Sequence, residues 1–193
     1  MSRNARVRSI PFFLAALAAL ALAAVAAAAV ITGTEGSDQI RGTNLADQIS
    51  ALGGNDFVDG ERGDDQIDGG LGNDKLEGNR GADQFTGQDG RDELRGGPQN
   101  DTLNGGNGRD NVDGQDGNDT LNGDAGPDDV RDNKGADAFN GGPGVDEVDA
   151  RDSGGQPVGT TADTITCAGG DEVRADRNDA IVNPAACGEI EID

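Results

Sequence analysis

The chain has 193 residues, of which 15 are Lys or Arg and 37 are Asp or Glu; it has no histidine, and its formal net charge at pH 7 is −22. A chain this acidic is excluded as a nucleic-acid binder that works through phosphate contacts. It also lacks Trp and Tyr, and it has two cysteines and 33 glycines. Without histidine, neither a Ser–His or Cys–His nucleophile pair nor a His-ligated zinc site can form.

Residues 1–29 have the pattern of a cleaved secretory signal peptide. Three arginines precede an uncharged run rich in Ala and Leu, which ends in three alanines. We expect cleavage after Ala29 and a secreted chain, extracellular or at the cell surface, with no membrane contact afterwards. An uncleaved membrane anchor is the alternative, because the run is long enough to span a bilayer. Removal of the segment brings the formal charge to −25.

From residue 33 to residue 149, aspartate recurs every nine residues, thirteen times without interruption. Few large apolar residues and a high net charge are otherwise typical of disorder, but disordered acidic sequence is not periodic. We predict that each of these aspartates is a metal ligand: Asp38, Asp47, Asp56, Asp65, Asp74, Asp83, Asp92, Asp101, Asp110, Asp119, Asp128, Asp137 and Asp146.

The other positions of the nine-residue unit, numbered with the aspartate sixth, predict a turn and a short strand. Position eight is a large apolar residue in all thirteen units, and positions seven and nine are polar apart from Phe57 and Ala138. This pattern indicates a very short strand with one buried side chain. Positions one and four are mostly glycine, which indicates a tight turn with positive φ at its glycines.

A unit that buries one side chain cannot fold alone, so the units are expected to stack as a solenoid. Residues 69–77 (GGLGNDKLE) and 105–113 match the pattern GGxGxDxUx, and the chain here resembles the repeat-in-toxin (RTX) nonapeptide family, the hemolysin-type calcium-binding repeats. The resemblance covers residues 33–149. It implies an all-β fold, a right-handed parallel β-roll with two nonapeptides per coil, and Ca²⁺ ions between successive turns on the same edge.

The residue types independently favour the same ion. Carboxylates and turn carbonyls without histidine or paired thiols form an all-oxygen site, and adaptable backbone loops suit Ca²⁺ better than Mg²⁺. If alternate units share an edge, the aspartates form columns of seven and six, with at most eleven ions between turns. Fewer ions are expected because Leu45, Ala51, Gln99 and Asp132 replace glycines and are expected to distort their loops.

The sequence argues against three other interpretations of the aspartates and of their neighbours. Solvated turn-forming aspartates are the first, but position six is never Asn or Ser in the thirteen units. An EF-hand is the second, but the segment 113–119 is followed by no closing Glu and no helical pattern. Asn100 and Asn118 each begin a glycosylation triplet, which the repeat itself explains.

After residue 149 the nine-residue spacing ends. Residues 150–160 are predicted to be a connecting loop, and residues 161–193, with aspartates eight residues apart, are predicted to be irregular cap coils covering the apolar end of the stack. A cap with cysteines resembles the tails of secreted bacterial calcium-binding proteins. Cys167 and Cys187 are expected to form a disulfide; two free thiols or an intermolecular bridge are the alternatives.

Three classes of function remain. We favour a secreted, non-enzymatic Ca²⁺-binding solenoid that folds on binding Ca²⁺ and has a structural, surface or matrix role, with a cell-surface or matrix polymer as a possible partner. The second is an accessory module related to a secreted hydrolase or epimerase. The third is a disordered acidic Ca²⁺ buffer.

Overall fold

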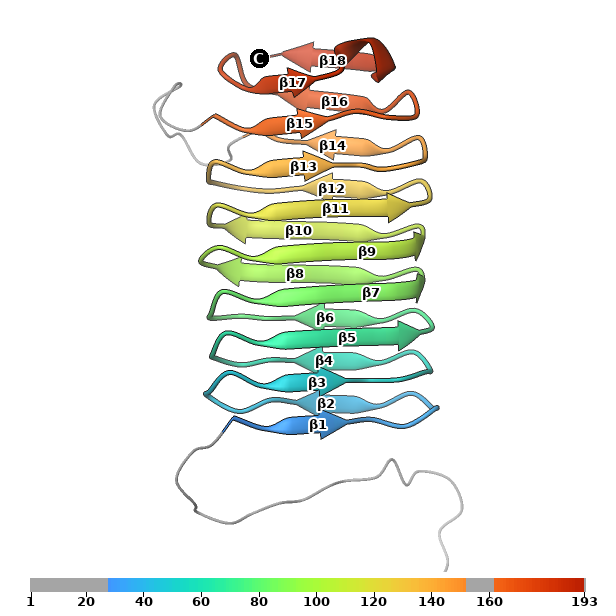
Figure 1. Cartoon of the computed structure of the whole chain (residues 1–193), viewed down its shortest axis with the longest axis vertical. Helices are drawn as coiled ribbons and strands as arrows, with labels where there is room; N and C mark the ends of the chain where they lie inside the picture. The colour runs from blue at the N-terminus through green and yellow to red at the C-terminus, as the bar shows by residue number, and fades with distance from the viewer. Residues whose placement is uncertain (1–27, 152–161, 193) are drawn as a thin grey trace, which may run out of the picture.

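The computed structural model describes residues 28–151 and 162–192, which form two parallel nine-stranded sheets and one short 3-10 helix. The chain alternates between the two sheets, so that they stack as the two faces of a solenoid (Figure 1). The odd-numbered strands form one sheet: β1 (Val30–Thr32), β3 (Gln48–Ser50), β5 (Gln66–Leu71), β7 (Gln84–Gly90), β9 (Thr102–Gly108), β11 (Thr120–Ala125), β13 (Ala138–Asn140), β15 (Thr164–Thr166) and β17 (Ala180–Val182).

The even-numbered strands form the other sheet: β2 (Gln39–Arg41), β4 (Phe57–Asp59), β6 (Lys75–Glu77), β8 (Glu93–Pro98), β10 (Asn111–Asp116), β12 (Asp129–Arg131), β14 (Glu147–Asp149), β16 (Glu172–Ala175) and β18 (Glu189–Ile192). The helix, η1, spans Pro184–Ala186. In this part of the chain, no helix is long and apolar enough to cross a membrane.

Strand pairing shows that two nonapeptides make one coil. Leu94 of β8 pairs with Val112 of β10, eighteen residues later, and Leu103 of β9 pairs with Leu121 of β11. The prediction of a parallel β-solenoid with this repeat is therefore confirmed, and the right hand of the coil stays a prediction.

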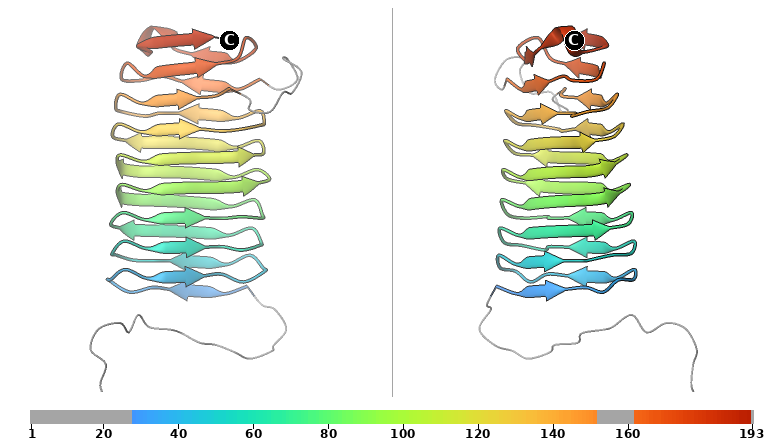
Figure 2. Two further views of the ribbon diagram at one scale, coloured as in Figure 1. Left: turned by 180° about the vertical axis from the view of Figure 1, so that it is seen from behind. Right: turned by 45° about the vertical axis from the view of Figure 1, so that its right-hand side comes forward.

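The apolar residues at position eight fill the space between the sheets. Val58, Leu76, Leu94 and Val112 have no exposed surface, while their neighbours at positions seven and nine point outward. The core is thus a single file of side chains in each sheet. The view turned by 45° shows the strands of both sheets stacked along the same long axis (Figure 2). Each coil buries its core only against the coils before and after it, as in other solenoids.

The strands in the middle of the stack are longer than the sequence predicts. Three residues per strand were expected, but β5 and β7–β11 have six or seven. The extra residues belong to positions one to four of the next unit, and they also pair with the next coil; Gly70 pairs with Gln88 and Gly90 with Gly108. The turn segment therefore adds its own ladder of hydrogen bonds to the stack.

Positive φ occurs at different turn positions from those expected. Position four has it, as at Gly72 (φ 127°), but position two has it as well and often without glycine, as at Gln88 (φ 74°). Position one has no positive φ at its glycines among the described units. A glycine at position one instead leaves space beside the carboxylate of the aspartate at position six of the same unit.

Both ends of the roll extend beyond the thirteen units. At the N-terminal end, Ile31 of β1 packs against the core nine residues before Ile40, a spacing that the sequence could have revealed. At the C-terminal end, β15–β18 continue both sheets, and Cys167 and Cys187 are joined by the expected disulfide. All four residues of β18 are exposed, so the last strand forms an open end of the sheet. The expected signal peptide up to residue 27 and the loop over residues 152–160 lie outside the described residues.

Candidate metal sites

The repeated aspartates form two columns, one along each turn edge of the roll. Within a column, each aspartate from Asp56 to Asp146 accepts a hydrogen bond through Oδ1 from the backbone N–H of the aspartate eighteen residues earlier. The N–H of Asp74 donates to Asp92 Oδ1 at 2.7 Å, and the N–H of Asp92 donates to Asp110 Oδ1 at 2.8 Å. This ladder uses one carboxylate oxygen per residue and fixes the orientation of the other.

The columns are longer than the sequence analysis proposed. Asp163, Asp171 and Asp179 of the cap accept the same hydrogen bond and extend them, and the backbone N–H of Ala29 begins one of them by donating to Asp47. The structure thus brings all thirteen predicted residues into two columns; the cap adds Asp163 and Asp179 to the end of one and Asp171 to the end of the other. Their role as metal ligands stays a prediction.

The second carboxylate oxygen of most column aspartates is buried and has no hydrogen-bond partner. Among the described residues this holds for Oδ2 of Asp56, Asp65, Asp74, Asp83, Asp92, Asp101, Asp110, Asp119, Asp128 and Asp146. A buried carboxylate oxygen without a partner has a large desolvation cost. Ten of them in two rows would need a cation or protons to offset this cost.

Nine of the ten unpartnered oxygens face a space next to the glycine at position one; the exception is that of Asp56, whose unit begins with Ala51. A Cβ atom added to Gly105 would lie 2.7 Å from Asp110 Oδ2 and 2.7 Å from the carbonyl oxygen of Gly123 in the next coil. A side chain at this position would fill the space where a carboxylate and a backbone carbonyl converge. Oxygen atoms from both sources are the ligands that Ca²⁺ prefers, and the described residues therefore fit this ion.

The pKa values of the column aspartates also favour a cation at the turn edges. Burial raises the pKa of Asp83 to about 7 and that of Asp101 to about 8; the backbone hydrogen bond opposes the rise and neighbouring column aspartates add to it. The pKa values of Asp92 and Asp128 are raised to about 7 for the same main reason. A cation between the turns would offset the repulsion and desolvation that raise these values.

At the N-terminal end of the roll, the carboxylates are already bonded within the chain. In the first two units a threonine takes position two, and the N–H groups of Thr34 and Thr43 donate to Oδ2 of Asp38 and Asp47, both at 2.6 Å. These two aspartates differ from the interior ones, because Oδ2 has a protein partner. Asp38 and Asp47 remain predicted ligands, although a backbone N–H group already bonds Oδ2 of each.

The aspartates of the cap are bonded in a similar way. Oδ2 of Asp171 accepts from the N–H of Ala168 at 3.0 Å, and Oδ2 of Asp179 accepts from that of Asp176 at 2.6 Å. At both ends of the columns, backbone N–H groups therefore bond the oxygen that is unpartnered in the middle.

Ala51 and Gln99 affect their turns less than expected, whereas Leu45 lacks the positive φ of most residues at position four. Ala51 at position one keeps the ladder bond, its N–H donating to Asp68 O at 2.8 Å, and it is fully buried. Gln99 at position four adopts φ 93°, so it follows the path of a glycine at a cost in backbone strain. Asp132 at position one is the important exception, because its carboxylate enters the space beside the column.

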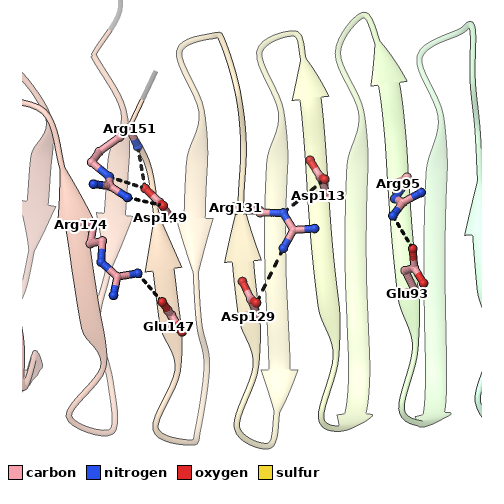
Figure 3. A network of polar contacts seen from close by, with 9 residues as sticks. All are labelled: Glu93, Arg95, Asp113, Asp129, Arg131, Glu147, Asp149, Arg151 and Arg174. Atoms are coloured by element: carbon pink, nitrogen blue, oxygen red, sulfur yellow. Dashed lines mark hydrogen bonds and ion pairs between the residues drawn. The ribbon is translucent and has the colours of Figure 1, made fainter. Parts of the chain in front are cut away.

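Basic residues neutralise acidic groups elsewhere, on the outer face of the even-numbered sheet (Figure 3). Arg131 lies 3.3 Å from Asp113 and 3.7 Å from Asp129, and Arg95 lies 2.6 Å from Glu93. These acids are at positions seven and nine, which point away from the core. The pairs drawn in Figure 3 therefore involve no column aspartate.

The fold and these edges define a class of protein, a parallel β-solenoid whose turn edges are lined with carboxylate and carbonyl oxygens. Comparison with protein families identifies the class: the RTX calcium-binding nonapeptide repeat matches seven overlapping segments, 32–67, 41–76, 68–103, 77–112, 86–121, 95–130 and 113–148. The chain belongs to this family, and its repeats are calcium-binding repeats. A search of curated proteins finds no match.

Proposed function

We propose that this protein is a secreted, non-enzymatic Ca²⁺-binding roll that folds when Ca²⁺ binds and serves a structural role at a cell surface or in a matrix. The main support is the two rows of buried Oδ2 atoms, ten in all, that have no hydrogen-bond partner among the described residues. The chain cannot bury these oxygens at neutral pH without either a cation or protons. Metal binding then supplies the folding free energy.

Ca²⁺-dependent folding is tested on the mature chain by far-UV circular dichroism and hydrodynamic radius during a Ca²⁺ titration. The chain should be expanded in chelator and should gain β structure cooperatively at about millimolar Ca²⁺, which is typical of extracellular modules. Equal concentrations of Mg²⁺ are the control for charge screening and should not fold it. An unchanged spectrum and radius in Ca²⁺ would favour the disordered buffer instead.

Secretion and the absence of enzymatic activity need separate experiments. The first residue of the protein recovered from the culture medium should be Val30 if cleavage follows Ala29. Assays of the Ca²⁺-loaded protein against polysaccharide and peptide substrates should show no turnover. Turnover that disappears with a column substitution would instead favour the enzyme-associated alternative.

A further inference from the structure

Asp132 occupies a position where the repeat almost always has glycine. It is the first residue of its unit, it is 8 % exposed, and both of its carboxylate oxygens lack a hydrogen-bond partner in the part of the chain that the structure describes. Its carboxylate lies with those of Asp119 and Asp137, and one oxygen from each of the three falls within 4.8 Å of the others. The side chain therefore points into a gap of the aspartate column.

The neighbouring gap of the same column shows what Asp132 changes. A Cβ atom added to Gly96 would lie 2.9 Å from the carbonyl oxygen of Gly114 in the next coil. One coil later, a Cβ atom added to Gly114 would lie 2.9 Å from Asp132 Oδ1 and 2.5 Å from Asp119 Oδ2. Asp132 thus presents a carboxylate oxygen where the gap below presents a neutral backbone carbonyl.

We propose that Asp119, Asp132 and Asp137 form a three-carboxylate site that binds one Ca²⁺ ion more tightly than the two-carboxylate gaps and fills before them. The inference rests on the proposed function, since it assumes that the gaps bind Ca²⁺. The physical reason is that the affinity of oxygen sites for Ca²⁺ rises with the number of charged ligands. A third carboxylate beside a divalent ion should lower the dissociation constant by about tenfold or more.

Asp132→Gly is the most informative variant because it restores the glycine of the repeat. Asp132→Asn keeps the size of the side chain and removes its charge. The matched control is Asp129→Asn, which removes one charge from the exposed outer face of β12, three residues earlier in the chain. All three variants keep the apolar residues of position eight and are expected to fold in Ca²⁺.

The first measurement is isothermal titration calorimetry of the mature chain with Ca²⁺. The second is europium luminescence with direct excitation, which needs no aromatic sensitiser in a chain without Trp or Tyr. The unmodified chain and Asp129→Asn should each bind one ion in a separate first step. In Asp132→Gly that step should merge with the others, and in Asp132→Asn its dissociation constant should rise by about tenfold or more.

The outcomes separate this inference from the proposed function. If the unmodified chain and Asp132→Gly both bind Ca²⁺ with identical isotherms, the three-carboxylate site is refuted while Ca²⁺ binding stands. If Asp132→Gly binds an additional ion or binds the first ion more tightly, Asp132 blocks the gap and the inference is wrong. If no form of the chain binds Ca²⁺, the proposed function itself fails.

Discussion

The difference between a placed ligand and a bulk charge can be tested in the middle of the stack with Asp92→Asn and Glu93→Gln. The two residues are adjacent and each substitution removes one negative charge. Asp92 is buried at the edge, where Oδ1 accepts the N–H of Asp74 and Oδ2 has no partner. Glu93 points outward from β8 and pairs with Arg95 at 2.6 Å and with Lys75 at 3.6 Å.

The structure predicts opposite effects of Asp92→Asn on the two states of the protein. Burial raises the pKa of Asp92 from 3.8 to about 7, which corresponds to at most about 4 kcal/mol of folding free energy at pH 8, and to about 2 kcal/mol after a reduction for solvent screening. A neutral asparagine avoids this cost and can still accept the N–H of Asp74. The metal-free fold should therefore become more stable, while the Ca²⁺ sites on either side lose a charged ligand.

The assay is a Ca²⁺ titration followed by circular dichroism, with bound Ca²⁺ counted by equilibrium dialysis. Asp92→Asn should bind fewer ions at saturation and raise the midpoint, whereas Glu93→Gln should change stability by no more than about 1 kcal/mol, because exposed ion pairs contribute little. Equal changes in both variants would mean that total charge, not the position of the carboxylate, governs binding. The reasoning from the unpartnered oxygen would then be refuted.

Four further measurements test the core, the turns, the charge and the cap. In chelator, the protein should gain β structure as the pH falls from 8 to about 4.5. The column aspartates have raised pKa values in the folded chain, so their contribution to stability is present at low pH and is lost as the pH rises through about 6 to 8. The absence of any gain on acidification would contradict this. Leu94→Ala should cost about 2 to 5 kcal/mol as a cavity. It should raise the Ca²⁺ midpoint only about twofold, because the cost would be divided among ions in about eight gaps, five between the unpartnered carboxylates of one column and three between those of the other. A much larger shift would show that few ions bind on folding. Gln99→Gly should add about 1 kcal/mol in urea unfolding by removing strain at φ 93°, and a loss of stability would argue against that strain. Reduction of the Cys167–Cys187 disulfide should lower the free energy of unfolding of the cap by about 3 kcal/mol. The measurement is hydrogen exchange, which should become faster only in residues 162–192. A uniform loss of protection along the chain would contradict a local role of the disulfide.

The regular part of the roll could be predicted because each unit repeats the same local physics. In each unit, an aspartate at the turn edge is followed two residues later by a buried apolar residue, as Asp74 is by Leu76. The nine-residue period places the apolar residues of successive coils opposite one another in the sheets, as Leu76 is opposite Leu94. Pairing of strands eighteen residues apart came from the family resemblance, and the structure confirms it. The disulfide followed from two cysteines in one predicted segment.

The units that depart from the regular repeat could not be predicted in detail, because their structures depend on contacts between coils. Asp132 was expected to distort its loop, but the direction of its carboxylate is set by the space above Gly114, eighteen residues earlier. Thr34 and Thr43 stand at a position where other units have various residues, and their bonds to the column aspartates are visible only in three dimensions. In each case the local sequence shows that the unit differs, and the neighbouring coil decides the consequence.

The placement of the basic residues explains why folding should depend on a metal ion. Arginines close to the edges could have paired with the column carboxylates, and the roll would then have folded without Ca²⁺. Instead, Arg95, Arg131 and Arg174 pair with acids on the outer face of the even-numbered sheet, where ion pairs are partly solvated and contribute little. Among the described residues the interior column carboxylates keep buried Oδ2 atoms without a partner. On the proposed function, the free energy that closes the stack at neutral pH therefore comes from Ca²⁺ bound between the turns.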